Sequence, residues 1–151
     1  MPRHARPPFD LTRRVEFSAA HRLHNPALSD EQNRALYGVC NNRNGHGHNY
    51  VLDVTVRGPV DPETGMVLDL NRLMAMLHEL VFLELDHKHL DHDVPWLAGT
   101  ISTAENVAAA IWTRLQPHLR GQLYRLRLYE SAMNYVDYHG LGDGGPDGGG
   151  S

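Results

Sequence analysis

The segment Cys40-Asn-Asn-Arg-Asn-Gly-His46-Gly-His48-Asn-Tyr50 runs directly into Val51-Leu-Asp-Val-Thr-Val-Arg57. Asn and Gly favour a turn in the first part, whereas the alternating β-branched residues of the second part predict a strand. Side chains two residues apart on a strand point to the same face, so His46 and His48 share the apolar parity of Tyr50. The sequence therefore predicts two imidazoles on an inward-facing strand surface.

A second strand-like segment, residues 13–21, ends in another histidine, His21, which has the parity of its apolar residues. Neutral imidazole is a good zinc ligand, and a set of three leaves the fourth tetrahedral position open for substrate. We predict that His21, His46 and His48 bind zinc in a Lewis-acidic site. The alternative is a chance grouping, because the chain has 11 histidines. The single cysteine, Cys40, lies six residues before His46 and favours a reactive site.

Composition narrows the class of protein. A chain of 151 residues with 41% hydrophobic content fits one compact domain. A net charge of −4 and a pI near 6.2 argue against a nucleic-acid-binding surface and favour a small-molecule substrate. No apolar run approaches the roughly 20 residues that span a membrane, and the N-terminus lacks the apolar region of a signal peptide. With one cysteine and no internal disulfide, a cytoplasmic location is expected.

We predict a flexible N-terminus (residues 1–8), one folded domain (residues 9–139) and a disordered glycine-rich tail (residues 140–151). The expected order of elements is strand, long loop, strand, turn, strand, helix, loop, helix, strand, strand. Residues 66–68 are predicted to be the hairpin partner of the His46 strand. A helix is expected to begin near Asp69, where an apolar stripe starts.

The second helix is indicated by Ser102-Thr-Ala-Glu105, a capping-box pattern, and Pro117 and Gly121 are expected to close it. Residues 122–130 then predict a strand with Tyr124, Leu126 and Leu128 on one face.

Glu130 falls on the apolar face of this last predicted strand. A carboxylate there is costly unless it meets a cation or several hydrogen-bond donors, and a ligand with two adjacent N–H groups would satisfy both oxygens. The alternative is that the strand ends before Glu130, which would then turn into solvent. Glu130 is therefore a candidate ligand anchor.

The chain resembles the 6-pyruvoyltetrahydropterin synthase family over about residues 17–138. The resemblance is carried by six motifs in the same order: Phe17-Ser-Ala-Ala-His21-Arg-Leu, Cys40-Asn-Asn-Arg-Asn-Gly-His-Gly-His-Asn-Tyr50, Asp61-Pro-Glu-Thr-Gly-Met-Val67, Leu85-Asp-His-Lys-His-Leu-Asp91, Ser102-Thr-Ala-Glu-Asn-Val107 and Tyr129-Glu130. The long spacing from cysteine to histidine is closer to the 6-pyruvoyl enzymes than to the related 6-carboxytetrahydropterin synthases of queuosine biosynthesis.

The resemblance implies an α+β tunnelling fold, in which each subunit has a four-stranded antiparallel sheet with two helices on one face. Three subunits would close a barrel, and two trimers would stack into a homohexamer with active sites between subunits. Barrel closure would cover sheet edges that are exposed in an isolated subunit.

The implied reaction is that of a zinc-dependent carbon–oxygen lyase of tetrahydrobiopterin biosynthesis. It converts 7,8-dihydroneopterin triphosphate to 6-pyruvoyltetrahydropterin with elimination of triphosphate. By the resemblance His21, His46 and His48 hold Zn²⁺. The implied catalytic residues are Cys40, which transfers protons, and the pair Asp86 and His87; the implied substrate-binding residues are Glu130, Thr103 and Glu105.

Within these assignments, adjacent residues generally point apart, so the carboxylate that orients His87 is expected to come from elsewhere in the assembly. Glu105 has an alternative role as a helix-capping residue. The residues that hold the triphosphate stay open among Arg13, Arg14, Arg22, Arg43 and Lys88, and Arg43 itself departs from the proline common in animal enzymes.

Three other functions stay open. The first is a 6-carboxytetrahydropterin synthase, a carbon–carbon lyase that would use the same substrate and metal and release acetaldehyde. The second is a zinc-binding module without catalysis. The third is a zinc hydrolase, which the absence of a His-Glu-x-x-His motif disfavours.

Overall fold

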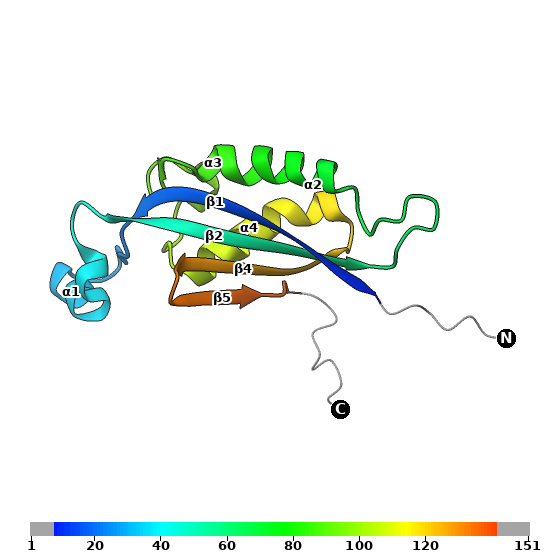
Figure 1. Cartoon of the computed structure of the whole chain (residues 1–151). Coiled ribbons are helices and arrows are strands. Elements are labelled where there is room, and N and C mark those ends of the chain that lie inside the picture. Colours follow the sequence, from blue (N-terminus) through cyan, green and yellow to red (C-terminus); the bar gives the residue numbers. More distant parts are fainter. Residues whose placement is uncertain (1–7, 142–151) are drawn as a thin grey trace, which may run out of the picture.

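The computed structural model describes residues 8–141, and within them one mixed sheet carries helices on one face (Figure 1). The elements in chain order are β1 Phe9–His21, α1 Asp30–Tyr37, the 3-10 helix η1 Gly38–Asn41, β2 His46–Gly58, α2 Leu70–Leu77, the π-helix η2 His78–Phe82, α3 Leu83–Leu85, β3 Lys88–His89, the 3-10 helix η3 Pro95–Leu97, α4 Ala104–Leu119, β4 Leu123–Ser131 and β5 Asn134–Tyr138. The predicted flexible end at residues 1–8 and the tail at 140–151 lie almost wholly outside the described residues.

The sheet has five strands in the order β3-β1-β2-β4-β5. Four of them form the antiparallel sheet that the resemblance implies, and β3 adds two residues in parallel pairing with β1 at Ala19 and Ala20. The expected sheet had four strands, whereas the observed sheet has a fifth, the short edge strand β3.

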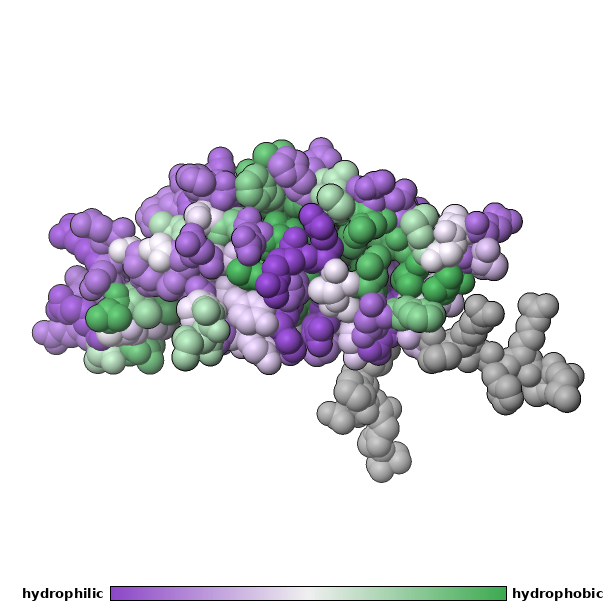
Figure 2. All heavy atoms as spheres, in the orientation of Figure 1, coloured by the Kyte–Doolittle hydropathy of each residue, from purple (hydrophilic) through white to green (hydrophobic). Residues whose placement is uncertain are grey.

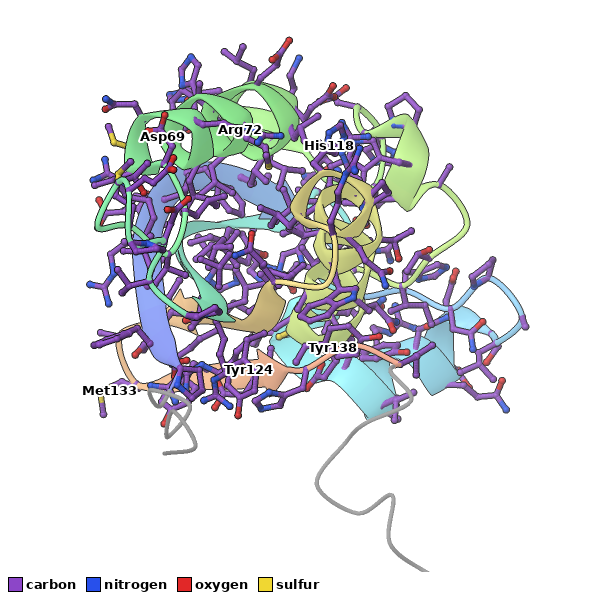
Figure 3. All side chains as sticks on the ribbon, turned by 90° about the vertical axis from the view of Figure 1, so that its right-hand side faces the viewer. Asp69, Arg72, His118, Tyr124, Met133 and Tyr138 are labelled. Carbon is purple, nitrogen blue, oxygen red and sulfur yellow. The ribbon has the colours of Figure 1, made fainter. Side chains whose placement is uncertain are left out.

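The helices cover one face of the sheet because its strands alternate apolar and polar side chains. α2, η2 and α3 form one continuous run along β1, and α4 packs over β4 and β5 (Figures 1 and 3). Leu73, Leu77 and Val81 from the first run meet Ile111 and Leu115 of α4 in the buried core above the strands. The predicted helix start at Asp69 is confirmed, since the Asp69 side chain accepts a hydrogen bond from the Asn71 N–H at the helix N-terminus.

Three local predictions are wrong. Residues 66–68 form no strand, and the loop after β1 contains α1 and η1. α1 begins with a complete capping box between Ser29 and Gln32, so a sequence signal for it was present. At α4 the cap is Thr103, one residue after the predicted Ser102, and the helix continues through Pro117.

β4 follows the prediction except at its start. The pairing of β2 with β4 shifts between Thr55 and Val56, so a bulge brings Leu123 to the buried face in place of Tyr124. Tyr124 instead lies on the outer side of the sheet, where the Arg57 guanidinium is 3.4 Å from its ring centroid (Figure 3). The strand reaches Ser131, so Glu130 is part of it, and the alternative in which the strand stops earlier is excluded.

Candidate active site

Register brings the three predicted histidines together at one end of the sheet. His21 is the cross-strand partner of His46, and Ala19 is the partner of His48, so all three rings lie on the helix-covered face. One ligand-type atom from each histidine lies within 4.8 Å of the others, and the three ring centroids are 4.7 to 5.1 Å apart. The predicted convergence of imidazoles from two strands is present.

The nitrogen atoms of this cluster fit a metal ion. The buried His21 ring donates its Nδ1 hydrogen to the Ser102 carbonyl at 2.8 Å, which leaves the Nε2 lone pair facing the cluster. His21 Nε2, His46 Nδ1 and His48 Nε2 are all buried without a hydrogen-bond partner among the described residues. Buried polar atoms are rarely left unpaired, and a bound cation would satisfy all three at once.

Glu130 of β4 adds a negative charge to the cluster. Its Oε1 atom lies 3.2 Å from His21 Nε2 and 3.5 Å from His48 Nε2, which are charge contacts without hydrogen-bond geometry. The contact with His21, against the effect of burial, lowers the pKa of Glu130. Burial acts against protonation of His21, but Glu130 and the Ser102 carbonyl outweigh it and raise the pKa of that imidazole.

The other two imidazoles are held neutral, which is the form that binds metals. Burial, followed by repulsion from the neighbouring histidines, lowers the pKa of His46. Burial is also the main cause of the lowered pKa of His48, and Glu130 offsets it in part.

A cavity of about 230 Å³ adjoins Glu130, and all three predicted substrate-binding residues line it. Thr103 and Glu105 come from the start of α4, while Leu23 closes another side. The Thr103 hydroxyl accepts a hydrogen bond from the Asn106 N–H at 3.3 Å and caps α4. Since Thr103 is the cap, the capping role considered for Glu105 is not needed here.

Asp86 and His87 form a pair at the other side of β1. The His87 Nδ1 atom donates to Asp86 Oδ2 at 2.6 Å, and Asp86 Oδ1 accepts from the Ser18 backbone N–H at 2.9 Å. These two hydrogen bonds, the one from Ser18 first, lower the pKa of Asp86. The expectation that a distant carboxylate orients His87 is wrong, because His87 has a φ of 57° that turns its ring back toward its neighbour.

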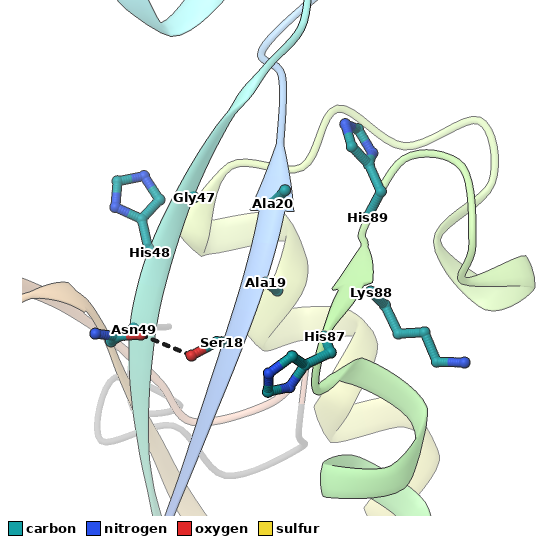
Figure 4. A pocket seen from close by; sticks show the side chains of 9 residues that line it. All are labelled: Ser18, Ala19, Ala20, Gly47, His48, Asn49, His87, Lys88 and His89. Carbon is teal, nitrogen blue, oxygen red and sulfur yellow. Dashed lines mark hydrogen bonds between the residues drawn. The ribbon is translucent and has the colours of Figure 1, made fainter.

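Among residues 8–141, this pair forms no hydrogen bond or ion pair with the three histidines. His87 lines an open cavity of about 460 Å³ together with His48 and Lys88, and its side chain is 83% exposed. Figure 4 shows the two rings within this pocket, His48 beside β2 and His87 on the other side of β1 with its ring turned toward that strand.

Cys40 lies in η1, half-buried, and its backbone carbonyl accepts a hydrogen bond from the Leu23 N–H at 2.9 Å. Its sulfur is not part of the metal-type cluster found within residues 8–141. η1 is tied to the chain segment that directly follows His21, so the thiol belongs to the same end of the sheet as the cluster.

Two residues of this site were not singled out by the sequence. The Ser102 carbonyl fixes the His21 ring, and a backbone acceptor just before a helix carries no signal in residue type. Gly45 was identified only as a turn former. Its φ is 77°, and a Cβ there would lie 2.8 Å from the His21 carbonyl oxygen, so only glycine fits without displacement.

Comparison with known proteins agrees with this geometry. The family model for 6-pyruvoyl tetrahydropterin synthase matches residues 10–141. The chain is 52% identical over 131 residues to human 6-pyruvoyl tetrahydrobiopterin synthase, covering 86% of this chain and 90% of that protein. A Rickettsia bellii 6-carboxy-5,6,7,8-tetrahydropterin synthase is 28% identical over 141 residues, covering 83% and 86%.

The structure of Caenorhabditis elegans 6-pyruvoyl tetrahydropterin synthase is similar with a TM-score of 0.84 and 43% identity, covering 89% of this chain and 96% of that chain. No helix within the described residues is long and apolar enough to cross a membrane. The sheet with its histidine cluster, the match over residues 10–141 and these relatives together show that the chain belongs to the 6-pyruvoyl tetrahydropterin synthase family.

Proposed function

We propose that the protein is a zinc-dependent 6-pyruvoyltetrahydropterin synthase, a lyase that converts 7,8-dihydroneopterin triphosphate to 6-pyruvoyltetrahydropterin with elimination of triphosphate. The observation that carries the proposal is the convergence of three buried, unpartnered imidazole nitrogens in a chain so similar to the human synthase. A three-histidine site leaves room for a substrate oxygen, as catalytic zinc sites do.

His21, His46 and His48 would hold the zinc ion through the three unpartnered nitrogens. When bound, zinc would polarise oxygens of the substrate side chain and make the neighbouring C–H bonds more acidic. The hydrogen bond from His21 to the Ser102 carbonyl fixes the tautomer and orientation of that ligand in advance.

Glu130 would anchor the amino-pyrimidine edge of the pterin through paired hydrogen bonds, with Thr103 and Glu105 at the mouth of the same cavity. Its contact with the histidine cluster means that the pterin ring would lie directly beside the metal-binding residues. Cys40 would take up and return protons on the substrate side chain. His87, oriented by Asp86, would exchange protons with that thiol.

The exposed side chain of His87, which forms no hydrogen bond with the cluster among the described residues, supports an active site shared between copies. Within the described part of the chain, β1 is paired with β3 only at Ala19 and Ala20, and β5 has a neighbour on one side only. Both edges of the described sheet therefore offer unpaired backbone groups. A homohexamer built as a dimer of trimers would close these edges. It would also allow His87 of one copy to complete the site of another.

The proposal is tested with zinc-loaded protein and 7,8-dihydroneopterin triphosphate, with released triphosphate and the pterin product measured together. We expect 6-pyruvoyltetrahydropterin as the main product and a hexameric mass in solution. Acetaldehyde as a major product would instead assign the protein to the 6-carboxytetrahydropterin synthases.

A Cys40→Ala variant separates catalysis from simple metal binding. It should keep one zinc ion per chain, because the sulfur lies outside the histidine cluster, and lose turnover by roughly 100-fold or more. Full turnover in that variant would refute the proton-transfer role. Inactivity of the wild-type protein on every dihydropterin would favour a zinc-binding module.

A further inference from the structure

A third cavity, of about 740 Å³, lies between the end of β1 and the segment formed by α1 and η1. Figure 1 shows this segment projecting beyond the end of the β1–β2 pair, and Figure 2 shows hydrophilic and hydrophobic residues mixed on its surface. Arg22, Arg34, Arg43 and His24 line the cavity, together with one carboxylate, Asp30. None of these residues has a role in the site described above.

The cavity is basic in a chain that is acidic overall, with a net charge of −4. Elsewhere the structure neutralises arginines in close pairs, as between Arg14 and Asp53 or Arg127 and Asp137. Arg22, Arg34 and Arg43 form no ion pair with any residue between 8 and 141. Three guanidinium groups thus face one cavity, and among the described residues that line it Asp30 is the one carboxylate that offsets their positive charge.

The guanidinium group of Arg22 is held in position by neutral groups of Asn41. Its Nε atom donates to the Asn41 carbonyl at 3.0 Å, while its backbone N–H donates to Asp91 Oδ2 at 2.7 Å. The buried Asn41 side chain donates in turn to the Leu23 carbonyl at 2.7 Å and to His24 Nδ1 at 3.1 Å. Because carbonyl groups orient the guanidinium without cancelling its charge, its remaining N–H donors are available to an anion.

The cavity adjoins the proposed active site through four consecutive residues. His21 belongs to the metal cluster, Leu23 lines the cavity that contains Glu130, and Arg22 and His24 line the basic cavity. Leu23 is also the residue bound to the Cys40 carbonyl. The basic cavity and the proposed pterin cavity therefore lie on either side of one short segment that starts at the metal ligand.

We propose that this basic cavity binds the polyphosphate chain of the substrate, with Arg22, Arg34 and Arg43 as the phosphate-binding residues. Planar guanidinium groups bind phosphate oxygens through paired hydrogen bonds, and three of them suit a chain of several phosphates. The inference rests on the proposed function, because it places the anionic end of that substrate. The same guanidinium groups could alternatively bind a free phosphate or polyphosphate ion.

The test uses Arg34→Ala and Arg43→Ala, because both side chains are exposed and without ion pairs, so the fold should be kept. Arg72→Ala is the matched control, since Arg72 is an exposed arginine on α2 that lies on a different element (Figure 3). Inorganic triphosphate is the probe, and its binding is measured by titration calorimetry on zinc-loaded protein. Arg34→Lys and Arg43→Lys keep the charge and remove the planar fork.

We expect each alanine variant to bind triphosphate roughly 10-fold or more weakly, each lysine variant to recover part of the loss, and Arg72→Ala to bind within about 2-fold of wild type. The KM for 7,8-dihydroneopterin triphosphate should rise by a similar factor while zinc content stays the same. Unchanged triphosphate binding in both alanine variants would overturn the assignment of the cavity. Weakened triphosphate binding with an unchanged KM would show a separate anion site and would overturn the substrate assignment.

Failure of the proposed function would look different. Wild type and Arg72→Ala would then both release no triphosphate from the pterin substrate. That result would refute the assignment of the cavity to the substrate's triphosphate, whatever the calorimetry shows.

Discussion

Gly45→Ala is expected to damage the metal site although residue 45 is not a ligand. Gly45 closes the turn before β2 by donating its N–H to the Asn42 carbonyl at 2.9 Å. An alanine Cβ there would lie 2.8 Å from the His21 carbonyl oxygen and 3.2 Å from His89 Nε2. The first neighbour is backbone and cannot rotate away, so relief of the clash must move His21 or His46.

Two costs add at this position. Alanine at a φ of 77° adopts the left-handed conformation, which costs roughly 1–2 kcal/mol. Overpacking against fixed neighbours typically costs about 1–3 kcal/mol more. Gly99→Ala isolates the first cost, because Gly99 also has a φ of 77° but no atom within 4 Å of the added Cβ.

The free energies of unfolding of wild type, Gly45→Ala and Gly99→Ala are measured by urea denaturation of the metal-free proteins. Zinc affinity is measured for all three by competition with a chelator. Gly45→Ala should be about 1–3 kcal/mol less stable than Gly99→Ala, and its zinc affinity should fall roughly 10-fold to 100-fold. Equal stability and equal zinc affinity in the two variants would refute the argument that close approach to His21 requires glycine.

Glu130→Gln should keep zinc and raise the KM for the pterin substrate by roughly 10-fold or more, whereas a loss of zinc would make Glu130 a metal ligand. Thr103→Ala should lower the urea-measured free energy of unfolding by about 1 kcal/mol, and Thr103→Ser should restore most of it, because serine also caps helices. Arg127 lowers the pKa of Asp137 from 3.8, so the stability from this pair is present above pH 3.8 and is lost as the pH falls through the lower folded pKa. Asp137→Asn should remove that acid dependence from the free energy of unfolding, measured by urea titration below pH 5. The change should be only about 0.2–1 kcal/mol because the pair is partly exposed. An unchanged pH profile would contradict the pairing.

The histidine cluster could be predicted from sequence because strand parity is a strict geometric rule. Each of the three histidines lies at the end of a strand segment in which every second residue is apolar. Antiparallel pairing of two such segments, with their apolar faces on the same side, leaves few possible registers. The same rule failed at Tyr124, where a bulge reverses parity within β4. A bulge depends on pairing with another strand, so the residues of β4 alone do not reveal it.

The Asp86–His87 pair shows a deeper limit of sequence reasoning. Neighbouring side chains diverge in helices and strands, and that rule predicted a remote partner for His87. The actual geometry depends on one left-handed residue, which is held because the His87 N–H donates to the Ser18 carbonyl and the Ser18 N–H donates to Asp86. Strain of this kind persists only where surrounding contacts fix it. The contacts that fix it come from β1, 68 residues earlier in the chain than Asp86, so the orientation of His87 is a property of the folded sheet and not of its own segment.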